Sequence, residues 1–124
     1  MNSASSRTNQ LESRFISFAA DIVALSAKLP STVQGRHVCR QILRSGTATA
    51  ANYGEARGAE SRSDFIHKLG IVLKELNETV IWLELAGRSG LVPAAELEAV
   101  IAENRELCRI VTASIKTARA PIDR

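Results

Sequence analysis

The chain has 124 residues, a length that suits one domain. Hydrophobic residues make up 45% of it and aromatic residues only 4%, a balance typical of helix bundles with aliphatic cores. The formal net charge of +3 is too small to indicate a class of partner by itself. No apolar run reaches the roughly 18 residues of a membrane span, and the polar start MNSASSRTNQ lacks the hydrophobic region of a signal peptide. We therefore expect a cytoplasmic protein that does not enter membranes.

A first helix is predicted from about Thr8 to Leu29, after a Ser- and Asn-rich segment, 1–7, that we expect to be flexible. Pro30 predicts its end, because proline disfavours helical backbone in the residue before it. Apolar residues recur along this helix in alternating steps of four and three, which indicates left-handed packing against a neighbour. They are Leu11, Phe15, Phe18, Ile22, Leu25 and Leu29.

A second helix is predicted from about Thr32 to Tyr53. Its second half, SGTATAA, consists of small and β-branched residues and is by itself a mediocre helix former. Small side chains would let a neighbouring helix approach closely, so packing can compensate. The segment Gly54–Glu60 is predicted to be a turn because of its glycines. Asn52 and Glu55 flank this predicted turn, where we expect them to bond free backbone groups or to pair with Arg57.

The strongest pattern lies in Ser61–Leu91, where three series of residues spaced seven apart form one broad, mostly apolar side of a helix. The series are Phe65, Val72, Thr79, Ala86; Ile66, Leu73, Val80, Gly87; and Leu69, Leu76, Leu83, Gly90. Ser61 with Asp64 marks the start, and Arg88 with Gly90 marks the end of a helix of about 26 residues. Its apolar side is too wide for one partner helix, so at least two other segments must cover it.

A fourth helix is predicted from about Pro93 to Ala118, and 120–124 is expected to be a frayed end. Asn104 is the polar residue of its apolar seam; it could set the register of packing or point to solvent at an oligomer boundary. Cys39 and Cys108 fall on apolar seams and are interpreted as small buried residues with reduced thiols. Four long helices with short connections predict an all-α, up-down-up-down antiparallel four-helix bundle over residues 8–119.

The run from Gln41 to Val92 resembles the bacterial family of four-helix-bundle proteins that includes proteins encoded in intervening sequences of 23S ribosomal RNA genes. The resemblance rests on LRSGT at 43–47, AN-x-x-EA at 51–56, DFIHKL at 64–69, KELNET at 74–79, WLEL at 82–85 and RSGL at 88–91. The chain also resembles in fold the accessory variability determinants of diversity-generating retroelements. One departure is Tyr53-Gly54, where many relatives carry an apolar residue and Ala; Gly54 is expected to loosen the end of the second helix.

The resemblance implies an up-and-down bundle without enzyme activity that forms a ring-like homo-oligomer, typically a pentamer. Because the retroelement members are associated with nucleic acid and with reverse transcriptase, it also implies these, or another nucleic-acid-processing protein, as partners.

A basic ridge is formed by Arg36, Arg40 and Arg44, which are four residues apart and lie on one side of the second helix. Arg57 and Arg62 follow near the next turn. Residues 1–62 hold eight Lys/Arg against four Asp/Glu, a balance of +4, whereas residues 63–124 hold eight against nine. Arginines at about 6 Å intervals can meet the phosphates of RNA or DNA, although no aromatic residues alternate with them for base stacking. The alternative is a solvated helix side or salt bridges between subunits.

Ile81 and Trp82 lie off the three apolar series, near Leu85, which indicates a further surface to cover. We interpret these residues as an oligomer interface; a wide intramolecular core is the alternative. The resulting hypothesis is a non-enzymatic homo-oligomeric scaffold that binds nucleic-acid backbone, or a nucleic-acid-processing partner, through its basic ridge. The competing hypothesis is a purely protein–protein interaction scaffold without nucleic-acid binding.

Catalytic and metal-binding patterns are weaker. Asp64 and His67 have the spacing of half a di-metal motif of helix bundles, but the second half is missing. Glu75 and Glu78 could be considered an acid/base pair, yet Lys74 lies four residues before Glu78, so surface ion pairing is the simpler account. No nucleophile elbow, phosphate loop or zinc-protease motif occurs. We therefore predict no enzyme activity, no metal and no cofactor.

Overall fold

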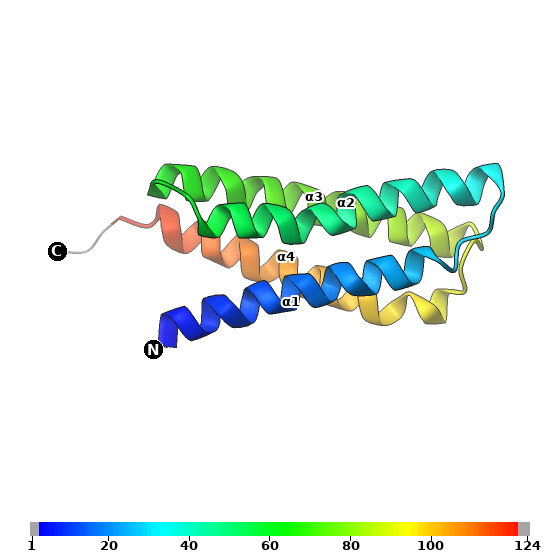
Figure 1. The fold of residues 1–124 in the computed structure, drawn as a ribbon, viewed down its shortest axis with the longest axis horizontal. Helices are drawn as coiled ribbons and strands as arrows, with labels where there is room; N and C mark the ends of the chain where they lie inside the picture. The colour runs from blue at the N-terminus through cyan, green and yellow to red at the C-terminus, as the bar shows by residue number, and fades with distance from the viewer. Residues whose placement is uncertain (1–2, 122–124) are drawn as a thin grey trace.

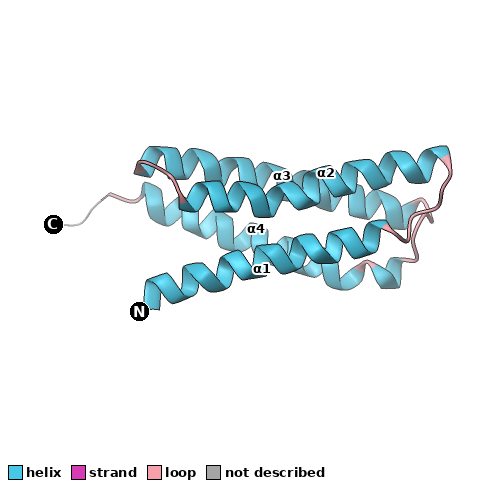
Figure 2. Ribbon diagram, in the orientation of Figure 1, coloured by secondary structure: helices cyan, strands magenta, loops and turns pink. Residues whose placement is uncertain are grey.

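The structure, a computed structural model, describes residues 3–121. Its helices are α1 (Ser3–Ser26), α2 (Val33–Arg57), α3 (Arg62–Arg88) and α4 (Glu98–Arg119), with a short 3₁₀ helix, η1 (Ala94–Glu96), before the last. The long helices lie side by side along one general direction, and successive helices run in opposite directions (Figure 1). Within the described range there are helices and loops but no strand (Figure 2). The predicted all-α arrangement of four helices is confirmed.

The bounds of the first helix differ from the prediction. Helix α1 begins at Ser3 rather than near Thr8, and it ends at Ser26, after which Lys28 N and Leu29 N bond the carbonyls of Leu25 and Ser26 in a turn. Of the segment expected to be flexible, residues 1 and 2 lie outside the described range. Of the end expected to be frayed, residues 122–124 do so as well.

The predicted end of α2 at Tyr53 is wrong, because the helix continues through Gly54 to Arg57. The predicted turn is therefore shorter and covers only residues 58–61. Tyr53 and Ala56 are buried in the core, and their packing outweighs the poor helix propensity of Gly54. The expected loosening at Gly54 is not seen.

Asn52 and Glu55 accordingly lie in the last turns of α2 rather than beside a turn. Glu55 reaches the turn through its main-chain carbonyl, which accepts a hydrogen bond of 3.1 Å from Gly58 N. Arg57 pairs with Glu12 of α1 and not with Glu55. The structural role predicted for these side chains is thus replaced by ordinary main-chain helix termination.

Polar side chains cap the N-terminal ends of α2 and α3. Thr32 Oγ1 accepts a hydrogen bond of 3.0 Å from Gly35 N at the start of α2. At the start of α3, Ser61 Oγ accepts one of 3.1 Å from Asp64 N. These bonds satisfy backbone groups that have no partner within the helix. The predicted start of α3 is confirmed, and so is its end, since Gly90 follows it with a φ of 75°. The last helix differs from the prediction, because η1 replaces its first turn.

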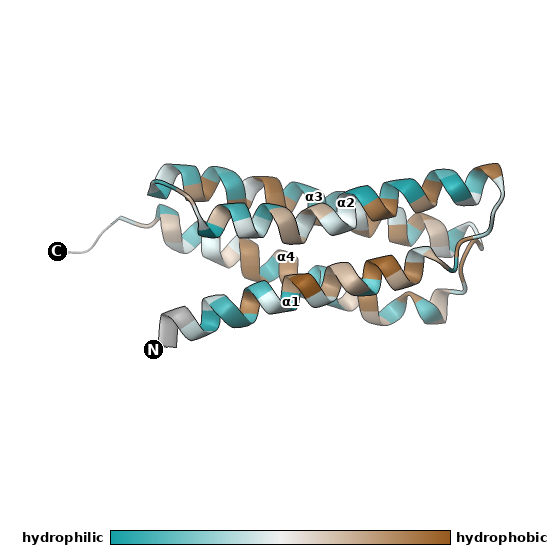
Figure 3. Ribbon diagram, viewed as in Figure 1, coloured by the Kyte–Doolittle hydropathy of each residue, from teal (hydrophilic) through white to brown (hydrophobic). Residues whose placement is uncertain are grey.

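The core lies between the four helices. The α1 seam is buried from Phe15 to Leu29, as predicted. On α3, one series is buried at Leu69, Leu76 and Leu83, and a second is buried at Val72, Thr79 and Ala86. The third series, which begins at Ile66, is only partly buried. Hydrophobic and hydrophilic segments alternate along the helices (Figure 3), as expected when one side of each helix faces the core.

The small residues of α2 allow close packing, as predicted. A Cβ atom added to Gly46 would lie 2.7 Å from Ile22 Cγ2 of α1, closer than carbon atoms can pack. Beside it, the Thr79 hydroxyl donates a hydrogen bond of 2.9 Å to the hydroxyl of Ser45. The two hydroxyl groups therefore join α2 to α3 inside the core.

Asn104 is fully buried, so the interpretation that it points to solvent is wrong. Its Oδ1 lies 3.7 Å from Cys108 Sγ. Cys39 and Cys108 are free thiols in half-buried positions, and burial raises the pKa of the Cys108 thiol. Over the described residues, no helix is both long and apolar enough to cross a membrane.

Candidate interaction face

The outward side of α2 carries the basic ridge, opposite the buried residues of that helix. Arg36, Arg40 and Arg44 are exposed, as the four-residue spacing predicts. Val33 and His37 share this side with them, and Val33 is 71% exposed. The ridge is therefore a mixed basic and apolar stripe.

The ridge arginines have unequal partners. Arg44 forms an ion pair with Glu78 of α3, and one of its nitrogens lies 3.7 Å from Glu75 Oε2. Arg36 donates a hydrogen bond to the carbonyl of Ser31. Arg40 has neither an ion pair nor a hydrogen bond to any residue that the structure describes. Among the residues that the structure describes, Arg36 and Arg40 thus have no carboxylate partner, whereas Arg44 is neutralised by Glu78.

The structure does not bring the other predicted arginines to the ridge. Arg57 faces α1, where its guanidinium donates hydrogen bonds of 2.9 Å to Glu12 Oε1 and 3.0 Å to Asn9 Oδ1. Arg62 is exposed at the first position of α3. It follows the C-terminal end of α2, whereas Arg36 lies near the N-terminal end of that helix. The five arginines therefore do not form one surface.

Exposed apolar residues lie on the outward side of α3. Ile81 is 65% exposed and Leu85 is 45% exposed. Trp82 is half-buried between them, and its Nε1 donates a hydrogen bond of 3.1 Å to Glu78 Oε2. These three residues and Glu78 follow steps of three and four, so they occupy one stripe of the helix.

The two stripes meet along the contact of α2 with α3. The rings of His37 and Trp82 are in edge-to-face contact, and Glu78 accepts hydrogen bonds from both Arg44 and Trp82. We call the combined surface the α2/α3 face. Its residues are Val33, Arg36, His37, Arg40 and Arg44 of α2, with Glu78, Ile81, Trp82 and Leu85 of α3. Sequence reasoning treated these stripes separately and missed Val33 and His37, although their spacing to Arg40 and Arg44 is helical.

Glu78 of this face and the neighbouring Glu75 both lie beside the guanidinium of Arg44. The indole N–H of Trp82, followed by the guanidinium of Arg44, lowers the pKa of Glu78, which keeps this carboxyl group ionised near neutral pH. His67 lies about three turns before Glu78 on α3 and is exposed. The described part of the chain holds no group of three His, Cys, Asp or Glu side chains that could bind a metal ion.

Comparison with known proteins matches the chain to one family. The model of the family described as 23S rRNA-intervening sequence protein matches residues 7–113. A crystal structure of a protein of unknown function from the S23 ribosomal protein family of Bacteroides thetaiotaomicron is 39% identical, with a TM-score of 0.80. That match covers 85% of this chain and 97% of the other. No curated protein is significantly similar to the chain.

Proposed function

The chain belongs to the family of 23S rRNA-intervening sequence proteins, and on this premise we propose that it is a non-enzymatic scaffold that assembles with further copies of itself through the α2/α3 face. The observation that carries the proposal is the exposure of Val33, Ile81 and Leu85 around the half-buried Trp82. Tryptophan and arginine are enriched in protein–protein interfaces, where apolar centres are surrounded by polar rims. Arg36 and Arg40 supply such a rim.

A closed ring would need a second, different face, because its subunits associate head to tail. Helix α1 offers one in Ile16 and Val23, which are seven residues apart on the same side of the helix and both exposed. Among the side chains that the structure describes, these two and the three of the α2/α3 face are the exposed large hydrophobic residues. The α1 stripe is the proposed counterpart of the α2/α3 face, and five copies is the number that the family resemblance implies.

Light scattering with a double variant tests the assembly. We expect the wild type at micromolar concentration to have the mass of several chains, and Ile81→Glu with Leu85→Glu to be monomeric, because charges would be buried in the interface. Ala102→Glu is the control; Ala102 is exposed on α4, which does not pack against α2. A monomeric wild type, or a double variant that assembles like the control, contradicts the proposal.

Binding of nucleic-acid backbone is the second candidate function. The observation that favours it is that Arg36 and Arg40 are exposed and pair with no carboxylate in the described part of the chain. Two contacts per chain would bind RNA or DNA weakly at physiological salt, and several copies on one assembly would raise the avidity. A nucleic-acid-processing protein such as a reverse transcriptase is a partner that would fit this function. A scaffold that binds proteins alone is the alternative.

A further inference from the structure

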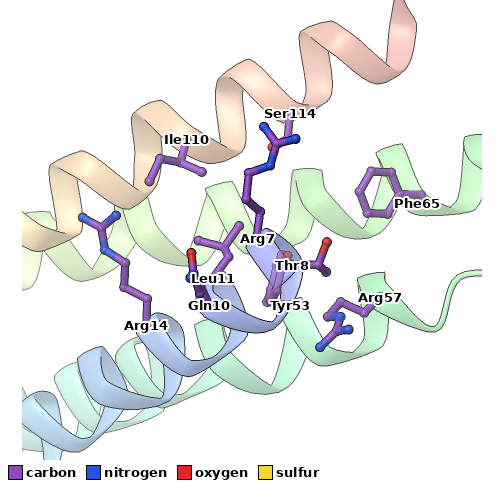
Figure 4. A pocket seen from close by; sticks show the side chains of 10 residues that line it. All are labelled: Arg7, Thr8, Gln10, Leu11, Arg14, Tyr53, Arg57, Phe65, Ile110 and Ser114. Atoms are coloured by element: carbon purple, nitrogen blue, oxygen red, sulfur yellow. The ribbon is translucent and has the colours of Figure 1, made fainter. Parts of the chain in front are cut away.

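A cavity of about 790 Å³ opens at the end of the bundle where α1 begins and α4 ends (Figure 4). It exists because α1 turns away from the other helices toward its first residues (Figure 1) and packs on α2 much more than on α4. All four long helices contribute to its lining, and none of the lining residues belongs to the α2/α3 face. Its volume lies within the range of about 300–1,000 Å³ that is usual for small-molecule sites.

The inner surface of the cavity is apolar. Leu11 of α1, Phe65 of α3 and Ile110 of α4 line it from three directions and are each only half-buried. Phe65 begins an apolar series on α3 whose later members are buried, so the core of the bundle is not closed at this end. An apolar ligand would bury the surface that these side chains leave exposed, which is favourable in water.

Cationic groups surround this apolar surface. Arg7, Arg14 and Arg57 line the cavity, whereas none of the acidic residues that the structure describes does. Arg14 donates hydrogen bonds of 2.7 and 2.8 Å to Glu103, and Arg57 pairs with Glu12 at 2.9 Å. In both pairs the guanidinium borders the cavity and the carboxylate does not. Because a guanidinium has five N–H donors, each arginine keeps donors for an additional acceptor.

Tyr53 adds a polar group to the lining of the cavity. Its side chain lines the cavity, is only 5% exposed and stacks on Phe15, with ring centroids 4.8 Å apart. Its hydroxyl group forms no hydrogen bond to another described residue, and it is not one of the fully buried polar atoms that lack a partner, so it remains accessible from the cavity. Burial raises the pKa of Tyr53, so the hydroxyl stays protonated and can donate to an anion.

We propose that this cavity binds a small organic anion with an apolar body, such as an aromatic or acyl carboxylate. The body lies against Leu11, Phe65 and Ile110, and the anionic group accepts hydrogen bonds from Arg57 and Tyr53. A small ligand fits better than a polymer, because the ion pairs Arg14–Glu103 and Arg57–Glu12 tie α1 to both of its neighbours beside the cavity. This site is independent of the self-assembly proposed above.

Isothermal titration calorimetry of the full chain tests the ligand class. The probes are 2-naphthoate and decanoate, an aromatic and an acyl carboxylate, with 2-naphthylmethanol and acetate as controls. We expect at least one of the two larger carboxylates to bind saturably with one site per chain. The naphthylmethanol, which lacks the charge, and acetate, which lacks the body, should not saturate in the same range. The proposal is overturned if neither larger carboxylate binds at millimolar concentration, or if naphthylmethanol binds as tightly as naphthoate.

Two variants locate the site. Tyr53→Phe keeps the ring and its stacking on Phe15 and removes only the hydroxyl, so affinity should fall about fivefold. Arg57→Gln removes a charged donor and should weaken binding about tenfold. Arg40→Gln, on the α2/α3 face, is the control and should bind like the wild type. Thermal unfolding checks that the Phe variant is folded, and wild-type affinity in both cavity variants would show that the anion does not bind here.

Discussion

The ring of His37 on α2 meets the ring of Trp82 on α3 edge to face, with centroids 5.6 Å apart and planes inclined by 78°. This contact joins the basic ridge of α2 to the exposed apolar residues of α3. Trp82 also donates to Glu78, which pairs with Arg44 of the ridge. A protein that covers Trp82 therefore also approaches the basic ridge. Self-assembly and nucleic-acid binding would use neighbouring residues, so each has to be tested with variants that affect only one of them.

Mixing two variants tests whether assembly is head to tail. One carries Ile81→Glu and Leu85→Glu, and the other carries Ile16→Glu and Val23→Glu. We expect each to be monomeric alone and an equimolar mixture to form complexes of two chains, because each variant supplies the face that the other lacks. Native mass spectrometry measures this directly. If the α2/α3 face instead bound itself, the α1 variant would assemble like the wild type and no mixed pair would form.

Nucleic-acid binding is tested with Arg36→Gln and Arg40→Gln combined. Loss of two phosphate contacts should make the negative slope of log affinity against log salt shallower by about 1.4 to 1.8, and by a similar amount for any nucleic-acid sequence. Arg44 is left unchanged because its removal would leave Glu75 and Glu78 without their cation. Fluorescence polarisation with labelled RNA and DNA gives the slopes, with Arg119→Gln, at the exposed end of α4, as the control. Failure of the wild type to bind at about 50 mM salt, or an unchanged slope, excludes this function for the ridge.

Two glycines on helices should respond oppositely to substitution by alanine. Gly46→Ala should destabilise the fold by about 1–3 kcal/mol, because the new Cβ would meet the Ile22 side chain at 2.7 Å. Gly70→Ala should stabilise it by up to about 1 kcal/mol, since nothing lies within 4 Å of the added atom. Urea unfolding measures both free energies. A Gly46 variant as stable as the Gly70 variant would mean that α1 moves away at no cost.

Asp64 should contribute a pH-dependent part of the stability. A hydrogen bond from Glu60 N and, next, the side chain of Lys68 lower the pKa of Asp64. A carboxyl group whose pKa is lower in the folded state stabilises the fold above its unfolded pKa, and this contribution is lost as pH falls through the folded pKa. Asp64→Asn should thus be less stable than the wild type at neutral pH, with the difference vanishing in acid.

Urea unfolding across this pH range measures the difference. Asp21→Asn is the control, because Asp21 is exposed on α1 and has no ion pair with any described residue. A difference for Asp64→Asn that persists unchanged into strong acid would assign the effect to something other than the charge.

The sequence by itself determined the number and order of the helices and which side of each is buried. Ile22 and Leu76 are fully buried, as their spacing predicts. This information is local, because the positions that share one side of a helix follow from its 3.6-residue turn. The start of α3 was equally predictable, since Ser61 caps a helix through a backbone group only three residues away.

The tertiary structure alone decided where α2 ends, which charges are neutralised and which surfaces coincide. Gly54 suggests a helix end, but the burial of Tyr53 on Phe15 extends the helix past it. Arg44 and Arg57 are exposed residues of the same helix, yet one pairs with Glu78 of α3 and the other with Glu12 of α1. Such pairings depend on the axial and rotational register of one helix against another. That register is set by side-chain packing across the core, which the periodicity of a single helix does not encode.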